Sequence, residues 1–244
     1  MKTGIQKFPQ RGEETRDRLL EVGIHLFGKL GFDGVSTRDI VRSAGITLPS
    51  IAHHFGSKEG LYEAVLEKIA EHMAANIAAA HTEAKSILGK RTTSRKEKIK
   101  ALEFLLYGHA RAVLQNRPEL VRLMIQEQTR PSKALTPITQ VFEDQFMAPL
   151  VMLLADVLGM KPKSPEVRLQ ALFLVGRVLV FRVARHLSLN TMEWDDFTPV
   201  RIEKILEALR QDLHCILANS ATKQRSLDRK LKPVRARTAS TYKA

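Results

Sequence analysis

The chain has 244 residues, which is enough for one large domain or two smaller ones. Apolar residues make up 44% of the sequence, so a core can be buried and a wholly disordered chain is excluded. The net charge of +13 favours a polyanionic partner. The longest apolar stretch without a charge, residues 145–155, is too short to span a membrane, and the N-terminus lacks the apolar region of a secretory signal. We therefore expect a cytoplasmic protein without a membrane partner.

The positive charge is unevenly distributed along the chain. Residues 1–11 carry +3 and residues 220–244 carry +7, and we interpret both segments as basic, flexible tails. Residues 82–130 carry +6, residues 131–219 are neutral, and residues 12–81 carry −3. Because the first folded region is acidic, its overall charge does not indicate a DNA-binding domain. Such a function has to be inferred from local patterns.

Apolar residues recur at helical spacing throughout the chain, which predicts an all-α fold. The expected helices lie at about residues 14–29, 36–43, 48–54, 58–81, 118–129, 137–158, 165–187 and 198–219, with one more that ends near residue 115. Pro149 predicts a kink in its helix. The polar and basic segment 88–100 is interpreted as a linker. Cys215, the only cysteine, lies in an apolar helical stretch, and we expect it to be buried.

Residues 36–58 read STRDIVRSAGITLPSIAHHFGSK and predict two short helices joined by a turn that contains glycine. The apolar residues of this segment form one face, which must pack on the neighbouring helices because such short helices are unstable alone. The opposite face carries cations and small hydrogen-bonding side chains. A helix of this kind fits the major groove of DNA. A helical hairpin with a solvated face is the alternative interpretation.

Two segments of the sequence narrow this choice. RDRLLEVGIHLFGKLGFDGVSTRDIVRSAGI, followed by SIAHHFGSKEGLYEAVLEKI, closely resembles the DNA-binding domain of TetR-type transcriptional regulators. The resemblance covers residues 12–72 and includes LF-x-x-x-GF, Thr37-Arg38-Asp39-Ile40, A-G-I and H-F-G-S-K-E-x-L. The HHFGSKEGLY segment and the length of the C-terminal half also resemble a subgroup with a CerR-like C-terminal domain.

The resemblance implies a helix-turn-helix domain at residues 12–72 and a helical-bundle domain for dimerisation and ligand binding at residues 98–219. It also implies a homodimer that binds a palindromic double-stranded DNA operator. This homodimer would release the operator when an unknown small-molecule effector binds its C-terminal domain. When the resemblance is mapped onto the polar, outward face of residues 36–58, it implies a set of DNA contacts. These residues are Thr37, Arg38, Thr47, Leu48, Pro49, Ser50, Ala52, His53, His54 and Lys58. The family often has a phosphate-contacting tyrosine where this chain has Ala52, so its role would pass to His53 or His54.

The second half supplies the expected dimer helices and ligand pocket. Residues 165–187 are apolar on nearly all sides, which favours a subunit interface built from this helix and from residues 198–219. Large side chains in the middle of the chain are typical of a core, and the resemblance implies a ligand pocket among them. The candidate ligand-binding residues are Phe104, Tyr107, His109, Met124, Phe142 and Phe146.

Other chemistry has little support in the sequence. The eight histidines lack metal-site spacing, and there is neither a glycine-rich phosphate loop nor a G-x-S-x-G motif. We therefore expect no metal, no cofactor and no enzymatic activity. The sequence predicts a homodimeric, sequence-specific transcriptional regulator that acts as a repressor. The alternative is an architectural nucleic-acid-binding protein that works without a ligand and depends on its basic tails.

Overall fold

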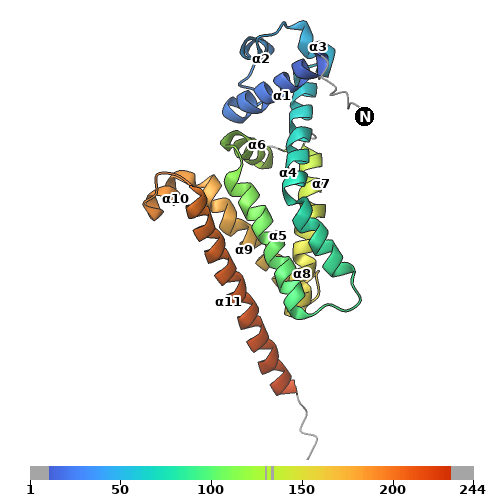
Figure 1. Ribbon diagram of the computed structural model, residues 1–244, viewed down its shortest axis with the longest axis vertical. Helices are drawn as coiled ribbons and strands as arrows, with labels where there is room; N and C mark the ends of the chain where they lie inside the picture. The colour runs from blue at the N-terminus through green and yellow to red at the C-terminus, as the bar shows by residue number, and fades with distance from the viewer. Residues whose placement is uncertain (1–10, 130, 133–134, 232–244) are drawn as a thin grey trace, which may run out of the picture.

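The computed structural model describes residues 11–129, 131–132 and 135–231, and all regular elements within these ranges are helices (Figure 1). This confirms the all-α prediction. The helices are α1 (Arg11–Leu30), α2 (Thr37–Ala44), α3 (Pro49–Phe55), α4 (Lys58–Gly89), α5 (Arg95–Gln115), α6 (Pro118–Thr129), α7 (Thr136–Phe142), the π-helical turn η2 (Glu143–Met147), α8 (Ala148–Leu158), α9 (Pro165–Val183), α10 (Arg185–Met192) and α11 (Pro199–Leu231).

Two hydrophobic cores divide the described residues, and the long helix α4 contributes to both. The first core joins α1, α2, α3 and the first half of α4, and α6 and α7 also pack against it. The second core joins the other half of α4 to α5, α8, α9 and α11. Figure 1 shows α1 to α3 at one end of the molecule and the α4–α5 connection at the other. Because α4 contributes to both cores, a displacement of α4 would affect the second core and the first three helices together.

Capping side chains define the start of two helices. Ser36 and Asp39 form a capping box at α2, and Ser94 and Glu97 form one at α5. The box at Ser94 starts α5 at Arg95, while α4 continues to Gly89. The predicted linker at residues 88–100 is therefore wrong for most of its length, because helix caps and helical residues occupy it. The connection is limited to residues 90–94.

The helix predicted over residues 137–158 is interrupted just before Pro149 by the π-helical turn η2, which lies between α7 and α8, and the kink itself stays a prediction. Proline has no backbone N–H, so the carbonyl of Gln145, four residues earlier, lacks its usual helical donor. Nδ1 of His81 lies 3.1 Å from this carbonyl oxygen and is placed to donate to it. The irregular turn is thereby attached to α4.

The C-terminal half differs from the sequence expectation in three places. Residues 165–187 form two helices, because α9 ends at Val183 and α10 begins at Arg185. α11 continues to Leu231, so the expected start of the tail at residue 220 falls inside a helix, and residues 1–10 and 232–244 lie outside the described residues. Cys215 is exposed, contrary to expectation, since Leu213 and Leu217 occupy the buried side of α11.

Within the described ranges, none of the helices is long and apolar enough to cross a membrane.

Candidate DNA-binding site

The helix pair α2–α3 is held by apolar contacts on its inner side. Ile40, Ala44 and Ile51 are buried in the first core. Gly45 ends α2 with a φ of 64°, in the left-handed region that a side chain with a Cβ rarely adopts. Ser57 then accepts a hydrogen bond from the amide of Gly60 and starts α4. The chain thus turns sharply at each end of α3 and presents one fixed surface outward.

The outer surface of α2 and α3 carries the predicted DNA contacts. Arg38, Thr47, Leu48, Pro49, Ala52 and His53 are exposed, and Thr37, Ser50, His54 and Lys58 are partly exposed. Leu48, at the entrance to α3, is 48% exposed although it is a large aliphatic residue. A leucine at this position could contact a thymine methyl group in the major groove. The structure brings all ten residues to one end of the molecule.

The polar groups of this surface are mostly free to bind a ligand. Arg38 makes no ion pair or hydrogen bond within the described residues, and Thr47 Oγ1 and Ser50 Oγ lie 3.4 Å apart. The rings of His53 and His54 pack edge to face, with centroids 4.9 Å apart. The hydrogen bond of Ser36 to Asp39 lowers the pKa of that carboxyl, which stays ionised at the start of α2. The cation that pairs with Asp39 is Arg42, at 3.8 Å, and not Arg38.

Lys58 has a structural role that sequence reasoning did not identify. Its Nζ donates to the carbonyl oxygens of Phe32 and Val35, both at 2.9 Å, and lies 4.0 Å from the centroid of the Phe32 ring. These contacts fix the α1–α2 connection against the start of α4. An ammonium group has three N–H donors, so one remains for the predicted phosphate contact. That contact stays a prediction.

The candidate ligand-binding residues do not form a single cluster. His109, Phe142 and Phe146 lie together, with the His109 ring stacked on Phe146 at a centroid distance of 4.0 Å. His109 is only 6% exposed, and its Nε2 is buried without a hydrogen-bond partner in the described part of the chain. Burial lowers the pKa of His109 to about 4, so the imidazole is neutral at physiological pH.

The other three candidates lie elsewhere. Tyr107 is two residues from His109 on α5 and therefore points to a different side of that helix. Burial raises the pKa of Tyr107 to about 12, the carboxylates of Glu103 and Glu207 also raise it, and the guanidinium of Arg210 lowers it. Phe104 is 47% exposed, and Met124 packs against the first core. The ligand-binding roles of these three residues remain predictions that the geometry does not unite.

A buried carboxylate links α4 to α6, and no sequence pattern identified it. Glu127 is 4% exposed and accepts a hydrogen bond from the hydroxyl of Tyr62. It also accepts one from the amide of Ser132 at 3.1 Å and one from its hydroxyl at 2.8 Å. Burial and the neighbouring carboxylate raise the pKa of Tyr62. Glutamate on an amphipathic helix is usually solvated, so its burial depends on how α6 crosses α4.

One side of α9 is apolar and uncovered in the single chain. Residues at helical spacing contribute to it, and it continues into α10 at Leu187. Phe173 is 56% exposed and Val183 is 59% exposed. The full set of exposed apolar residues on this side, which we call the α9 face, is Leu169, Leu172, Phe173, Leu179, Val180, Val183 and Leu187. An apolar surface of this kind normally marks an interaction site.

Two family models match the chain. Residues 19–65 match the bacterial regulatory proteins of the tetR family, and residues 100–220 match the C-terminal domain of the HTH-type transcriptional dual regulator CecR. These matches confirm both resemblances predicted from the sequence. CecR of Shigella flexneri is 24% identical over 222 residues, which cover 89% of this chain and 96% of that protein. The regulatory protein RaaS of Mycobacterium tuberculosis is 44% identical over 63 residues, which cover 26% of this chain and 29% of that protein.

Solved structures have the same fold. A TetR-like regulator from Rhodococcus sp. RHA1 has a TM-score of 0.55 at 20% identity, covering 84% of this chain and 97% of that one. AmtR of Mycobacterium smegmatis has a TM-score of 0.54 at 17% identity, covering 92% and 98%. The family consists of transcriptional regulators and not of enzymes, as expected. The chain is a member of the TetR family of bacterial transcriptional regulators.

Proposed function

We propose that this chain is a homodimeric repressor that binds a palindromic operator through α2 and α3 and is released by a small-molecule effector. The observation that carries the proposal is the outer surface of α2–α3, where hydroxyl, imidazole and guanidinium groups are exposed on a rigid apolar base. Side chains of these types bind base edges and phosphates. A rigid base is needed because base recognition depends on fixed positions of the donors and acceptors.

The α9 face supports the dimer. Its exposed aliphatic and aromatic side chains would be covered by the same face of a second copy around a two-fold axis. A dimer of this kind carries two recognition helices, which fit successive major grooves when they are about 34–36 Å apart. The operator would then have two related half-sites.

The unpartnered Nε2 of His109 supports an effector site beside the π-helical turn. A neutral imidazole, stacked on Phe146 and close to Phe142, suits a mostly apolar or aromatic ligand that offers one polar group. π-Helical turns often occur at functional sites. Since His81 attaches the η2 turn to α4, a ligand that shifts this turn would also act on the helix that leads to α3.

The experiment is a selection of duplexes from a randomised library by the full-length protein. We expect one inverted-repeat sequence to be enriched. Ser50→Ala or His53→Ala should change the preferred bases, whereas Arg38→Met should weaken binding to every duplex and lower the salt slope by about 0.9. Arg38 is the matched control because it is exposed and unpaired on the same surface. A panel of apolar compounds is then tested for release of the selected duplex.

The architectural alternative predicts a different result. Such a protein would bind all duplexes equally, and its affinity would depend mainly on the basic tails. If no sequence is enriched and Ser50→Ala binds like the wild type, the repressor proposal is wrong.

A further inference from the structure

A second concentration of positive charge lies at the end of the molecule opposite to α2 and α3 (Figure 1). It comprises the last part of α4, the connection at residues 90–94 and the first turns of α5. Residues 82–100 contain seven cations and only two carboxylates, Glu83 and Glu97. The cations are Lys85, Lys90, Arg91, Arg95, Lys96, Lys98 and Lys100. We call this surface the distal basic surface. It contrasts with the acidic residues 12–81 around the DNA-binding helices.

Most of this charge is not neutralised within the protein. Lys98 pairs with Asp156 of α8 at 2.7 Å, and Glu97 is used in the capping box with Ser94. The other six cations are exposed and make no ion pair or hydrogen bond within the described residues. Six free cations on a short segment repel one another, and an anion bound there would relieve that repulsion.

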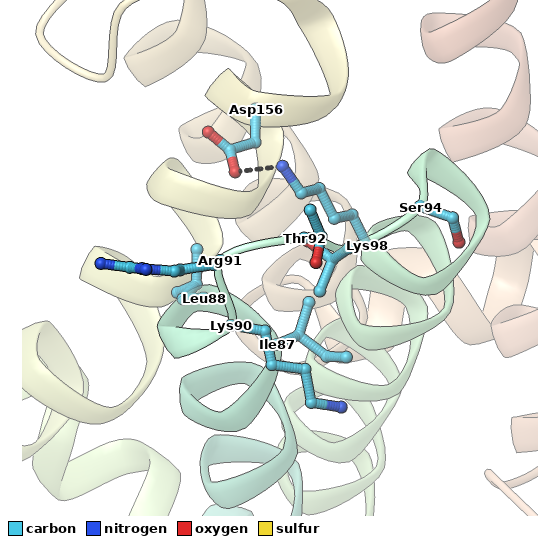
Figure 2. A pocket seen from close by; sticks show the side chains of 9 residues that line it. Ile87, Leu88, Lys90, Arg91, Thr92, Ser94, Lys98 and Asp156 are labelled. Atoms are coloured by element: carbon cyan, nitrogen blue, oxygen red, sulfur yellow. Dashed lines mark hydrogen bonds and ion pairs between the residues drawn. The ribbon is translucent and has the colours of Figure 1, made fainter.

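The arrangement of the side chains indicates the form of the anion. A cavity of about 490 Å³ is lined by Lys90, Arg91 and three successive hydroxyl residues, Thr92 to Ser94. Figure 2 shows Lys90 and Arg91 extending in different directions from the chain instead of converging on one point. A single phosphate would need converging donors, whereas a row of phosphates matches cations that are spread out. The surface therefore suits an extended polyanion.

Duplex DNA is the polyanion that fits best. Surfaces that bind lipid bilayers usually insert aromatic or large aliphatic side chains. Residues 82–100 expose no such side chain, so a membrane surface fits this segment less well than DNA does. α11 also runs toward this end of the molecule (Figure 1). The DNA bound by α2 and α3 lies at the other end of the molecule, so it cannot reach this surface without strong bending.

We propose that the distal basic surface binds the phosphates of a second DNA segment, without reading its bases, so that one protein molecule bridges two duplexes. The proposal goes beyond operator binding and relies on the proposed function only for the first duplex. A regulator with this property would hold its operator near other DNA and would favour loops.

The test is a bridging assay with the full-length protein. One duplex is fixed to beads, a fluorescent duplex of unrelated sequence is added in solution, and its retention is measured over a range of salt concentrations. The triple variant Lys90→Glu, Arg91→Glu, Lys96→Glu should lower retention about tenfold. The slope of log retention against log salt concentration should become shallower by about 3, because each lost phosphate contact lowers that slope by about 0.9. Its affinity for a single selected duplex should stay within about twofold of the wild type, which separates this proposal from the proposed function.

Two controls accompany this variant. Lys90→Arg, Arg91→Lys, Lys96→Arg keeps the charge and should bridge like the wild type, and Lys204→Glu reverses an exposed charge on α11 and should also bridge. All variants should melt at the wild-type temperature. Retention that survives the triple reversal would assign bridging to the tails and overturn the proposal. So would a wild-type protein that binds one duplex but retains no second one, or one that binds phosphatidylglycerol vesicles at this surface in place of DNA.

Discussion

Among the histidines that the structure describes, His109 is the one that is buried, and burial shifts its pKa. It is buried beside Phe146, and its pKa is lowered to about 4 from the ordinary 6.5 because burial penalises the charged imidazolium. Between these two pH values the unfolded chain binds a proton that the folded protein does not. The contribution to stability is therefore present above pH 6.5 and is lost as the pH falls to about 4.

This difference makes the free energy of unfolding depend on pH. We expect it to fall by roughly 1.4 kcal/mol per pH unit within this window on account of His109, about 3 kcal/mol in all. Urea denaturation at several pH values between 7.5 and 4.5 measures the slope. His109→Phe should flatten the curve, whereas replacing the exposed His186 by Phe should not. An equal slope in wild type and His109→Phe would show that this imidazole is not held neutral.

Lys58 illustrates why one residue can serve both structure and binding. Two of its N–H groups are used by the carbonyls of Phe32 and Val35. Removing it would leave those carbonyls without their charged donor, which costs about 1–3 kcal/mol. A loss of DNA affinity in a Lys58 variant could therefore come from a less stable fold or from a lost phosphate contact, and the measurement would not separate the two causes. Arg38 lacks such internal bonds and is the better probe of phosphate binding.

At the scale of single helices, the two capping boxes provide a matched pair. Ser36 at α2 and Ser94 at α5 make the same set of hydrogen bonds to the third residue of the helix. Ser36→Ala and Ser94→Ala should each lower the free energy of unfolding by about 1 kcal/mol. Only Ser36→Ala should also weaken operator binding, because only α2 supports the recognition helix. Denaturation curves and duplex titrations of both variants test this, and equal DNA affinities would contradict it.

The sequence predicted elements well where local signals fix them. The bounds of α6 follow from Pro118, which suits a first turn, and α2 and α3 are bounded by Ser36, Gly45 and Gly56. The linker prediction failed because the polar, basic composition of residues 88–100 concealed the cap at Ser94. Charged residues are good helix formers, so polarity alone does not separate a linker from an exposed helical turn.

The remaining errors have a tertiary origin. Cys215 lies among apolar neighbours in the sequence, yet it is exposed because the packing of α11 buries Leu213 and Leu217. Helical spacing gives the relative directions of side chains on one helix but not the helix that each will meet. This is why the sequence grouped Met124 with Phe146, although they belong to different cores. The burial of Glu127 depends on the same helix crossings.

At the scale of the whole molecule, the two cores allow the ends to act together. α4 is part of both cores, and the Tyr62–Glu127 bond and the His81–Gln145 bond attach it to α6 and to the π-helical turn. In the proposed function, a shift of α4 within the second core would also move the part of α4 that packs against α3. Coupling worth about 1.4 kcal/mol would already change DNA affinity tenfold.

In the proposed function, half-site recognition depends on a dimer, which is a property of the whole molecule. Phe173 belongs to the α9 face and is 56% exposed in the single chain, so Phe173→Glu should leave the fold intact. In a dimer the same carboxylate would be buried without a partner, which is strongly unfavourable. We expect the wild type to be a dimer at micromolar concentration in light scattering, and Phe173→Glu to be a monomer with the same helical circular dichroism.

Two further variants sharpen this result. Met152→Glu changes an exposed residue of α8 outside the α9 face and should remain a dimer, whereas Val175→Glu places a charge in the second core and should unfold the chain. The Phe173→Glu monomer should bind a single half-site weakly and lose most of its preference for the inverted repeat, because its single recognition helix is no longer joined to a second one about one DNA turn away. A wild-type monomer, or a Phe173→Glu protein that is still a dimer, would show that the α9 face has another partner.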